Sequence, residues 1–80
     1  MRIMNLLDEI EKKFQEAIKL ANNGKEKKAI VIMSRCMRAL ERYIGRSHGA
    51  DRIRAIILLR KIGKIHTELS EKEFKTEENN

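Results

Sequence analysis

Few side chains in this sequence could act as a nucleophile, an acid or a base, and they are scattered along the chain. They are Ser34, Cys36, Tyr43, Ser47, His48 and His66. Zinc sites place cysteine and histidine ligands at short, regular spacings, and the single cysteine and two histidines here have no such spacing. We therefore expect no metal site, no cofactor, no small-molecule substrate and no catalytic residue, which makes the protein a non-enzyme.

One spacing nevertheless fits chemistry on RNA. Arg42 is followed, after five intervening residues, by His48, and the pair could supply a cation for a phosphate and an acid or base for a ribose hydroxyl. This spacing resembles the R-x4-6-H motif of HEPN ribonucleases, helical proteins that act on RNA across a dimer. The resemblance implies, as an alternative, a HEPN-like ribonuclease that uses Arg42 and His48. HEPN domains have four or more helices, however, and only three are predicted for this chain.

Apolar residues recur at helical spacing in three segments, which predicts amphipathic helices over residues 3–22, 26–44 and 52–69. The expected core residues are Ile3, Leu6, Leu7, Ile10, Phe14, Ala17, Ile18 and Ala21, then Ala29, Ile30, Met33, Cys36, Met37, Leu40, Tyr43 and Ile44, then Ala55, Leu58, Leu59, Ile62, Ile65, His66 and Leu69. Because Cys36 lies in the middle of an apolar face, we expect it to be buried and unreactive. We expect His66 to be partly buried.

These segments predict an all-α fold, a small three-helix up-down-up bundle made of a helical hairpin plus a third helix, which dimerisation could complete. Asn22-Asn23-Gly24 is expected to end the first helix, because Asn and Gly tolerate the left-handed conformation at a helix end. We expect one bundle domain over residues 1–69 and a polar acidic tail, frayed or disordered, over residues 70–80.

The predicted hairpin has a family resemblance of its own. Between Ala17 and Cys36, small or apolar residues flank the turn at Gly24, and this stretch resembles the helical hairpin of TPR and MIT modules. The large aromatic residue that begins a TPR is Lys13 here, and the closing proline is missing. The resemblance therefore supports the hairpin and implies no function.

The stretch between the second and third predicted helices carries a possible phosphate site. Residues 45–49 are expected to end the second helix, and Asp51 is expected to cap the third. Arg46, His48 and Arg52 flank this turn, so backbone N–H groups and cations could hold a phosphate there. The ordinary alternative, which the sequence favours, is a plain loop between helices.

The chain is basic, and its positive charge is concentrated in the middle. It has 18 Lys and Arg against 12 Asp and Glu, a net charge of +6. Residues 25–66 hold 12 of the basic residues and three of the acidic ones. Such an imbalance favours nucleic acid or an acidic protein surface as the partner. The residues expected to contact that partner are Lys27, Lys28, Arg35, Arg38, Arg42, Arg46, Arg52, Arg60 and Lys64.

A second surface is predicted on the third helix, where Ile53, Ile56 and Ile57 lie outside the core face. Exposed apolar side chains that cluster mark an interface, so we expect a larger protein partner or a second copy of the chain to cover them. The sequence thus favours a small non-enzymatic accessory or adaptor protein, a subunit or partner of a DNA- or RNA-processing complex. A direct nucleic-acid-binding regulator, helical and able to dimerise, is the alternative.

The expected location is the cytoplasm, with no membrane partner. Cys36 has no second cysteine with which to form a disulfide, and no apolar run approaches the roughly 20 residues of a membrane span. Asp8, Glu9 and Glu11 interrupt the N-terminal apolar residues, which argues against a signal peptide. The many Ile, Lys, Glu and Arg residues without Pro resemble the composition of thermophilic archaeal proteins.

Overall fold

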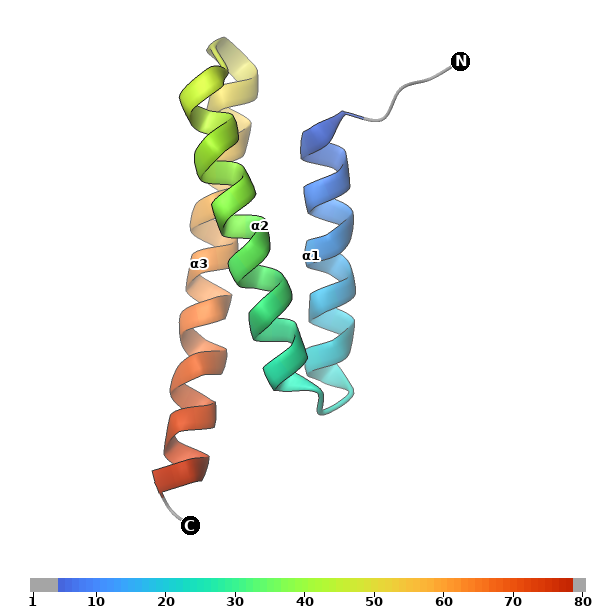
Figure 1. The fold of residues 1–80 in the computed structure, drawn as a ribbon, viewed down its shortest axis with the longest axis vertical. Helices are drawn as coiled ribbons and strands as arrows, with labels where there is room; N and C mark the ends of the chain where they lie inside the picture. The colour runs from blue at the N-terminus through green and yellow to red at the C-terminus, as the bar shows by residue number, and fades with distance from the viewer. Residues whose placement is uncertain (1–4, 79–80) are drawn as a thin grey trace.

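The structure, a computed structural model, describes residues 5–78 of the chain and the side chains of residues 5–73. It contains three α-helices, α1 (Leu6–Asn22), α2 (Glu26–Arg46) and α3 (Gly49–Glu78). Helix α2 packs against both neighbours, whereas α1 and α3 barely touch (Figure 1). The predicted fold, an all-α up-down-up bundle of three helices, is confirmed.

The ends of α1 follow from its flanking polar residues. The side chain of Asn5 accepts a hydrogen bond from the backbone N–H of Leu7 at 2.9 Å, which satisfies one of the free donors at the helix start. At the other end, Gly24 adopts the left-handed conformation with φ +83°, and the Lys25 N–H donates to the Leu20 carbonyl at 2.8 Å. The predicted stop after the first helix is therefore confirmed.

The second turn is shorter than the sequence predicts. Helix α2 continues through Gly45 to Arg46, only Ser47 and His48 separate it from α3, and Gly49 takes the left-handed conformation with φ +63°. The expectations that Gly45 ends α2 and that Asp51 caps α3 are wrong. Glycine can continue a helix as well as end one, and the chain reverses at Gly49, which places Asp51 in the first turn of α3.

Helix α3 also extends beyond its predicted limits. It begins three residues before Arg52 and ends nine residues after Leu69. No Gly or Pro follows Gly63, so nothing in the local sequence stops the helix. The Lys72 ammonium lies 3.2 Å from the carboxylate of Glu26, which ties this part of α3 to the start of α2. The expected acidic tail is thus helical as far as Glu78, and its last two residues lie outside the described chain.

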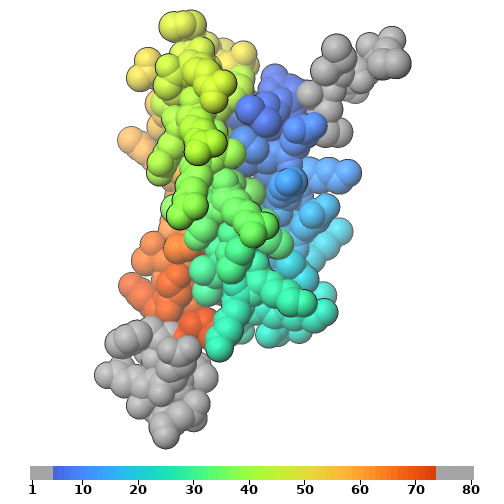
Figure 2. All heavy atoms as spheres, in the orientation of Figure 1, coloured from blue at the N-terminus to red at the C-terminus, as the bar shows by residue number. Residues whose placement is uncertain are grey.

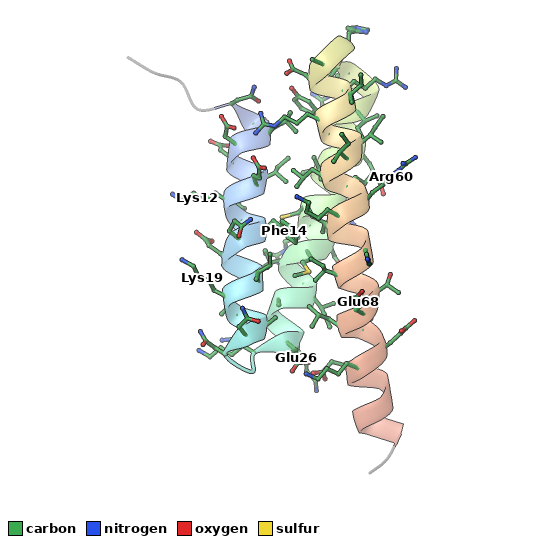
Figure 3. All side chains as sticks on the ribbon, turned by 180° about the vertical axis from the view of Figure 1, so that it is seen from behind. Lys12, Phe14, Lys19, Glu26, Arg60 and Glu68 are labelled. Atoms are coloured by element: carbon green, nitrogen blue, oxygen red, sulfur yellow. The ribbon has the colours of Figure 1, made fainter. Side chains whose placement is uncertain are left out.

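The core lies where the three apolar faces meet along α2. Its fully buried side chains include Leu7, Phe14, Met33, Leu40 and Ile62. Figure 3 shows Phe14 pointing into the space between the helices. All the buried core residues are among those predicted: Leu7, Ile10, Phe14, Ala17, Ala29, Met33, Cys36, Leu40, Ala55, Leu58 and Ile62.

One predicted core residue is misplaced and one lies outside the described residues. Leu6 is 47% exposed, because α1 starts below the turn that joins α2 to α3 and has little of α3 to pack against (Figure 1). Ile3 falls in the part of the chain that is not described. Conversely, Ile32 and Ala39 pack against the core from the side of α2 that faces α1, where no contribution was predicted.

Candidate nucleic-acid interface

The arginines of α2 form one exposed row. Arg35, Arg38, Arg42 and Arg46, here called the arginine row, lie on the outer side of the helix, and all four are exposed. At 3.6 residues per turn and 1.5 Å per residue they fall within an arc of about 80° and extend over about 17 Å of helix. Within the described chain no carboxylate forms an ion pair with any of them. Figure 2 shows that α2, which carries the row, lies across the front of the molecule between α1 and α3.

Arg54 on α3 is the opposite case. Its Nη2 donates to Asp8 Oδ1 at 3.0 Å and to Glu11 Oε2 at 2.7 Å. The hydrogen bond to Asp8, followed by that to Glu11, raises the pKa of the Arg54 guanidinium. This contact spans the seam between α1 and α3, the two helices that otherwise barely touch. Arg54 is therefore held by carboxylates of another helix, whereas no carboxylate of the described chain forms an ion pair with the arginine row.

The structure divides the other predicted binding residues between two regions. Lys27 and Lys28 are exposed at the start of α2, and Lys27 already interacts within the chain. Arg52, Arg60 and Lys64 are exposed on α3, and Figure 3 shows Arg60 pointing away from the bundle. The predicted basic residues thus lie on two helices. On α2, Lys28 shares the arc of the arginine row and lies about two turns before Arg35.

A groove of about 740 Å³ opens where α2 turns into α3. It exists because α1 begins short of this end of the bundle (Figure 1), so no third helix fills the space beside the turn. The groove, here called the turn groove, is lined by Leu6, Ala39, Arg42, Tyr43, Arg46, Ser47, His48 and Asp51. Arg42 and His48, whose spacing resembles the HEPN motif, therefore face the same groove.

Sequence reasoning identified the cations of the turn groove but missed three of its other features. The Ser47 Oγ is buried and has no hydrogen-bond partner, a property that the sequence alone does not reveal. Tyr43, predicted as core, is half-buried and lines the groove. Leu6 comes from the far end of the sequence, so only the packing of α1 could reveal its place in this wall.

A second, smaller hollow of about 200 Å³ continues along the seam between α1 and α2. It shares Leu6 and Ala39 with the turn groove, and its charged lining residues are Glu9, Lys13 and Arg35. Three members of the arginine row thus border these two hollows, whereas Arg38 lines neither. Arg38 therefore offers a substitution that touches the row and leaves both hollows unchanged.

The apolar surface predicted on α3 is present, with one correction. Ile53 is 60% exposed and Ile57 is 58% exposed, whereas Ile56 is half-buried. Ile56 was expected to be as free as its neighbours and instead turns toward the packed side of the helix. Ile53 and Ile57 line a shallow hollow of about 310 Å³ beside Arg54 and Lys61. We call Ile53 and Ile57 the α3 patch.

Cys36, Ser34 and His66, the other side chains that could act as a nucleophile, acid or base, lie in contacts between the helices. Cys36 is 3% exposed, and burial raises the pKa of its thiol above the ordinary value of 9.0. The hydroxyl of Ser34 lies 2.9 Å from His66 Nε2, so the partly buried His66 joins α2 to α3. Among the described residues no group of three or more His, Cys, Asp or Glu side chains could hold a metal ion. None of the helices described is long and apolar enough to cross a membrane.

Comparisons with known proteins gave no match from which a function could be inferred. No protein-family model matches the chain, and no similar curated protein or solved structure was found. Function is therefore argued from the arrangement of side chains alone.

Proposed function

We propose that this protein is a small non-enzymatic accessory protein that binds the phosphate backbone of a nucleic acid through the arginine row. The observation that carries the proposal is that Arg35, Arg38, Arg42 and Arg46 form a solvent-facing stripe without a carboxylate partner in the described chain. The planar guanidinium fork suits bidentate contacts with phosphate oxygens. An unpaired row has no internal ion pair to break before it binds.

The spacing of the row supports a backbone contact. Phosphates follow one another every 3.4 Å along the axis on each strand of duplex DNA, so a row of about 17 Å meets several of them. Stacking on unpaired bases needs exposed aromatic side chains, but Phe14 is buried and Tyr43 is half-buried. The proposal is therefore a binding mode that depends on charge and salt and only weakly on base sequence.

The α3 patch is proposed to bind a protein partner with an acidic, apolar surface. Ile53 and Ile57 supply the exposed apolar area, and Lys61 lines the same hollow. Arg60 and Lys64 are exposed on the same helix. Positive charge around the patch opposes a second copy of the chain and complements acidic residues on a different protein. Together the two surfaces describe an adaptor that joins a protein complex to nucleic acid.

Salt-dependent binding of a fluorescent DNA duplex tests the nucleic-acid part. The duplex should end in 5′-hydroxyl groups, and binding should be followed by anisotropy over a range of salt concentrations. In the variant Arg35→Gln/Arg38→Gln, the slope of log affinity against log salt should fall by about 0.9 for each phosphate that the variant no longer neutralises. Thermal stability should stay close to that of the wild type, because neither side chain has an ion-pair partner in the described chain.

The matched control removes the same charge from another face. Lys12 and Lys19 point away from the bundle on α1 (Figure 3), so Lys12→Gln/Lys19→Gln should leave the slope close to that of the wild type. Equal reductions of the slope in both variants would mean that net charge alone drives binding. Absence of binding to duplex and single strands at low salt would overturn the nucleic-acid proposal.

The α3 patch is tested with a helical peptide that has one leucine face and one glutamate face. The Ile57→Glu variant should bind this peptide at least about tenfold more weakly, because the substitution removes apolar area from the interface and brings two like charges together. Sedimentation of the wild type alone should show a monomer. A dimer that Ile57→Glu dissociates would assign the patch to a second copy of the chain instead.

The ribonuclease alternative has a direct test, because Arg42 and His48 line one groove. Single-stranded RNA incubated with the purified protein should remain intact. Cleavage that disappears in both Arg42→Ala and His48→Ala would replace the non-enzymatic proposal with catalysis in the turn groove.

A further inference from the structure

We propose that the turn groove is a binding site for the terminal phosphate monoester of a nucleotide. The ligand is either a free nucleotide or the phosphorylated end of a nucleic-acid strand, since both present the same phosphate, sugar and base. The strand-end version rests on the proposed function, because the arginine row would hold the neighbouring backbone. A groove of about 740 Å³ lies within the usual range of small-molecule sites.

Three cationic or protonatable side chains converge on this groove. Arg42 and Arg46 are one turn apart on α2, and His48 follows in the turn. Neither arginine is paired with a carboxylate in the described chain. A phosphate monoester carries between about −1.5 and −2 charges at neutral pH, whereas an internal phosphodiester carries a single charge. A concave group of three such side chains therefore selects a chain end over the middle of a strand.

Ser47 provides an independent pointer to a ligand. Its Oγ is buried without a hydrogen-bond partner, and the residue lines the groove. Buried hydroxyl groups in folded proteins are nearly always hydrogen-bonded. Rotation about the Cα–Cβ bond of Ser47 would turn its hydroxyl from this unsatisfied position into the groove, where it would donate to a phosphate oxygen held between the arginines. The backbone adds to this, because α3 starts at Gly49 and the first N–H groups of a helix favour an anion.

The rest of the wall suits the remainder of a nucleotide. Leu6, Ala39 and Tyr43 form an apolar side against which a sugar or base could pack. Asp51, also in the wall, would repel a second phosphate and accept hydrogen bonds from ribose hydroxyls or a base amino group. The groove thus offers both basic and apolar side chains, which is the combination that a nucleoside monophosphate requires.

The test compares two duplexes of the same sequence, one with 5′-phosphate and one with 5′-hydroxyl ends. The wild type should bind the phosphorylated duplex about tenfold more tightly, the size expected when hydrogen bonds to a charged group are formed. Ser47→Ala and His48→Gln should remove this preference and leave affinity for the hydroxyl-ended duplex unchanged. Arg38→Gln, which lies outside the groove, should weaken both duplexes equally and preserve the ratio.

Adenosine 5′-monophosphate and inorganic phosphate separate the two sources of ligand. Displacement of the phosphorylated duplex by adenosine monophosphate, reduced in Ser47→Ala, would assign the groove to free nucleotides. A preference for the phosphorylated duplex that neither competitor displaces would assign it to strand ends. Equal affinity for both duplexes and no binding of adenosine monophosphate would overturn the site while leaving the backbone proposal intact. Binding of adenosine monophosphate without any duplex binding would support the groove site and overturn the backbone proposal.

Discussion

Arg54 and the arginine row show the same residue type in two different situations. Arg54 projects from α3 toward α1 and is held by Asp8 and Glu11 at 3.0 and 2.7 Å. The arginine row projects from the outer side of α2, and no carboxylate of the described chain pairs with it. The difference lies in what faces each helix, because α1 turns acidic residues toward α3 while solvent faces the row.

The charge of Arg54 is therefore part of the structure, whereas the charges of the arginine row are available to a partner. The Arg54 contact is exposed and joins two helices that barely touch, so it positions α1 relative to α3 and is screened by salt. The arginine row positions no described element. A count of positive charges alone would place Arg54 and Arg38 in the same class.

The largest expected effect comes from removing the packing that brings the carboxylates of α1 to Arg54. Phe14 is 1% exposed in the core, and Phe14→Ala should destabilise the protein by about 3–5 kcal/mol. A domain of this size has a total stability of roughly 4–12 kcal/mol, so the variant should unfold at a much lower temperature than the wild type. Circular dichroism during heating measures this, and a melting temperature close to that of the wild type would contradict the described core.

A smaller effect is expected at Cys36, which lies in the seam between α1 and α2. Its Sγ lies 3.8 Å from the Ile10 carbonyl, and Cys36→Ala should cost about 1 kcal/mol because little volume is removed. Burial raises the thiol pKa above 9.0, so the unfolded chain loses this proton first. The protonated Cys36 thiol therefore makes its full contribution to the free energy of unfolding below pH 9.0. This contribution falls as the pH rises further, because the thiol of the unfolded chain ionises while the buried one does not.

Reactivity provides the measurement for Cys36. A maleimide reagent should label the native protein at pH 7 far more slowly than the denatured protein, because the thiol is buried and protonated. Labelling at equal rates would show that the α1–α2 seam opens freely. That outcome would also weaken the assignment of Leu6 to the wall of the turn groove.

The smallest effect is expected at the ion pair between Glu26 and Lys72, which, like the Arg54 contact, joins two helices. Lys72 is 67% exposed and Glu26 15% exposed, so Glu26→Gln should cost no more than about 1 kcal/mol. The consequence should be local, with faster hydrogen exchange in α3 after residue 66 and little change elsewhere. Unchanged exchange in this segment would mean that the ion pair does not hold the end of α3.

The sequence predicts the core well because helical periodicity determines which residues face inward. Leu7, Phe14, Met33 and Ile62 repeat at spacings that only a buried helix face explains, and all four are buried. The ends of the helices are predicted less well. Gly45 and Gly49 are equivalent as local signals, and only the packing of α3 against α2 decides that the chain reverses at Gly49.

The candidate site depends on contacts that local sequence does not contain. Asp8 lies 46 residues before Arg54, so nothing near Arg54 distinguishes it from Arg52 or Arg60. Three members of the arginine row, Arg35, Arg38 and Arg42, could be predicted because they share one face of a predicted helix, whereas Arg46 joins them only because α2 continues beyond residue 44. The turn groove could be predicted only in part, since its cations are close together in sequence but Leu6 and the buried Ser47 hydroxyl join them through folding.

Two single substitutions test whether Arg54 is tied to carboxylates of this chain while the arginine row is available to a partner. Arg54→Gln and Arg38→Gln remove the same charge, and each variant is measured for melting temperature and for the salt dependence of duplex binding. Arg54→Gln should lower the melting temperature and leave the salt slope unchanged, because its partners are Asp8 and Glu11. Arg38→Gln should leave the melting temperature unchanged and reduce the slope by about 0.9. Equal effects of the two substitutions on both quantities would contradict the claim.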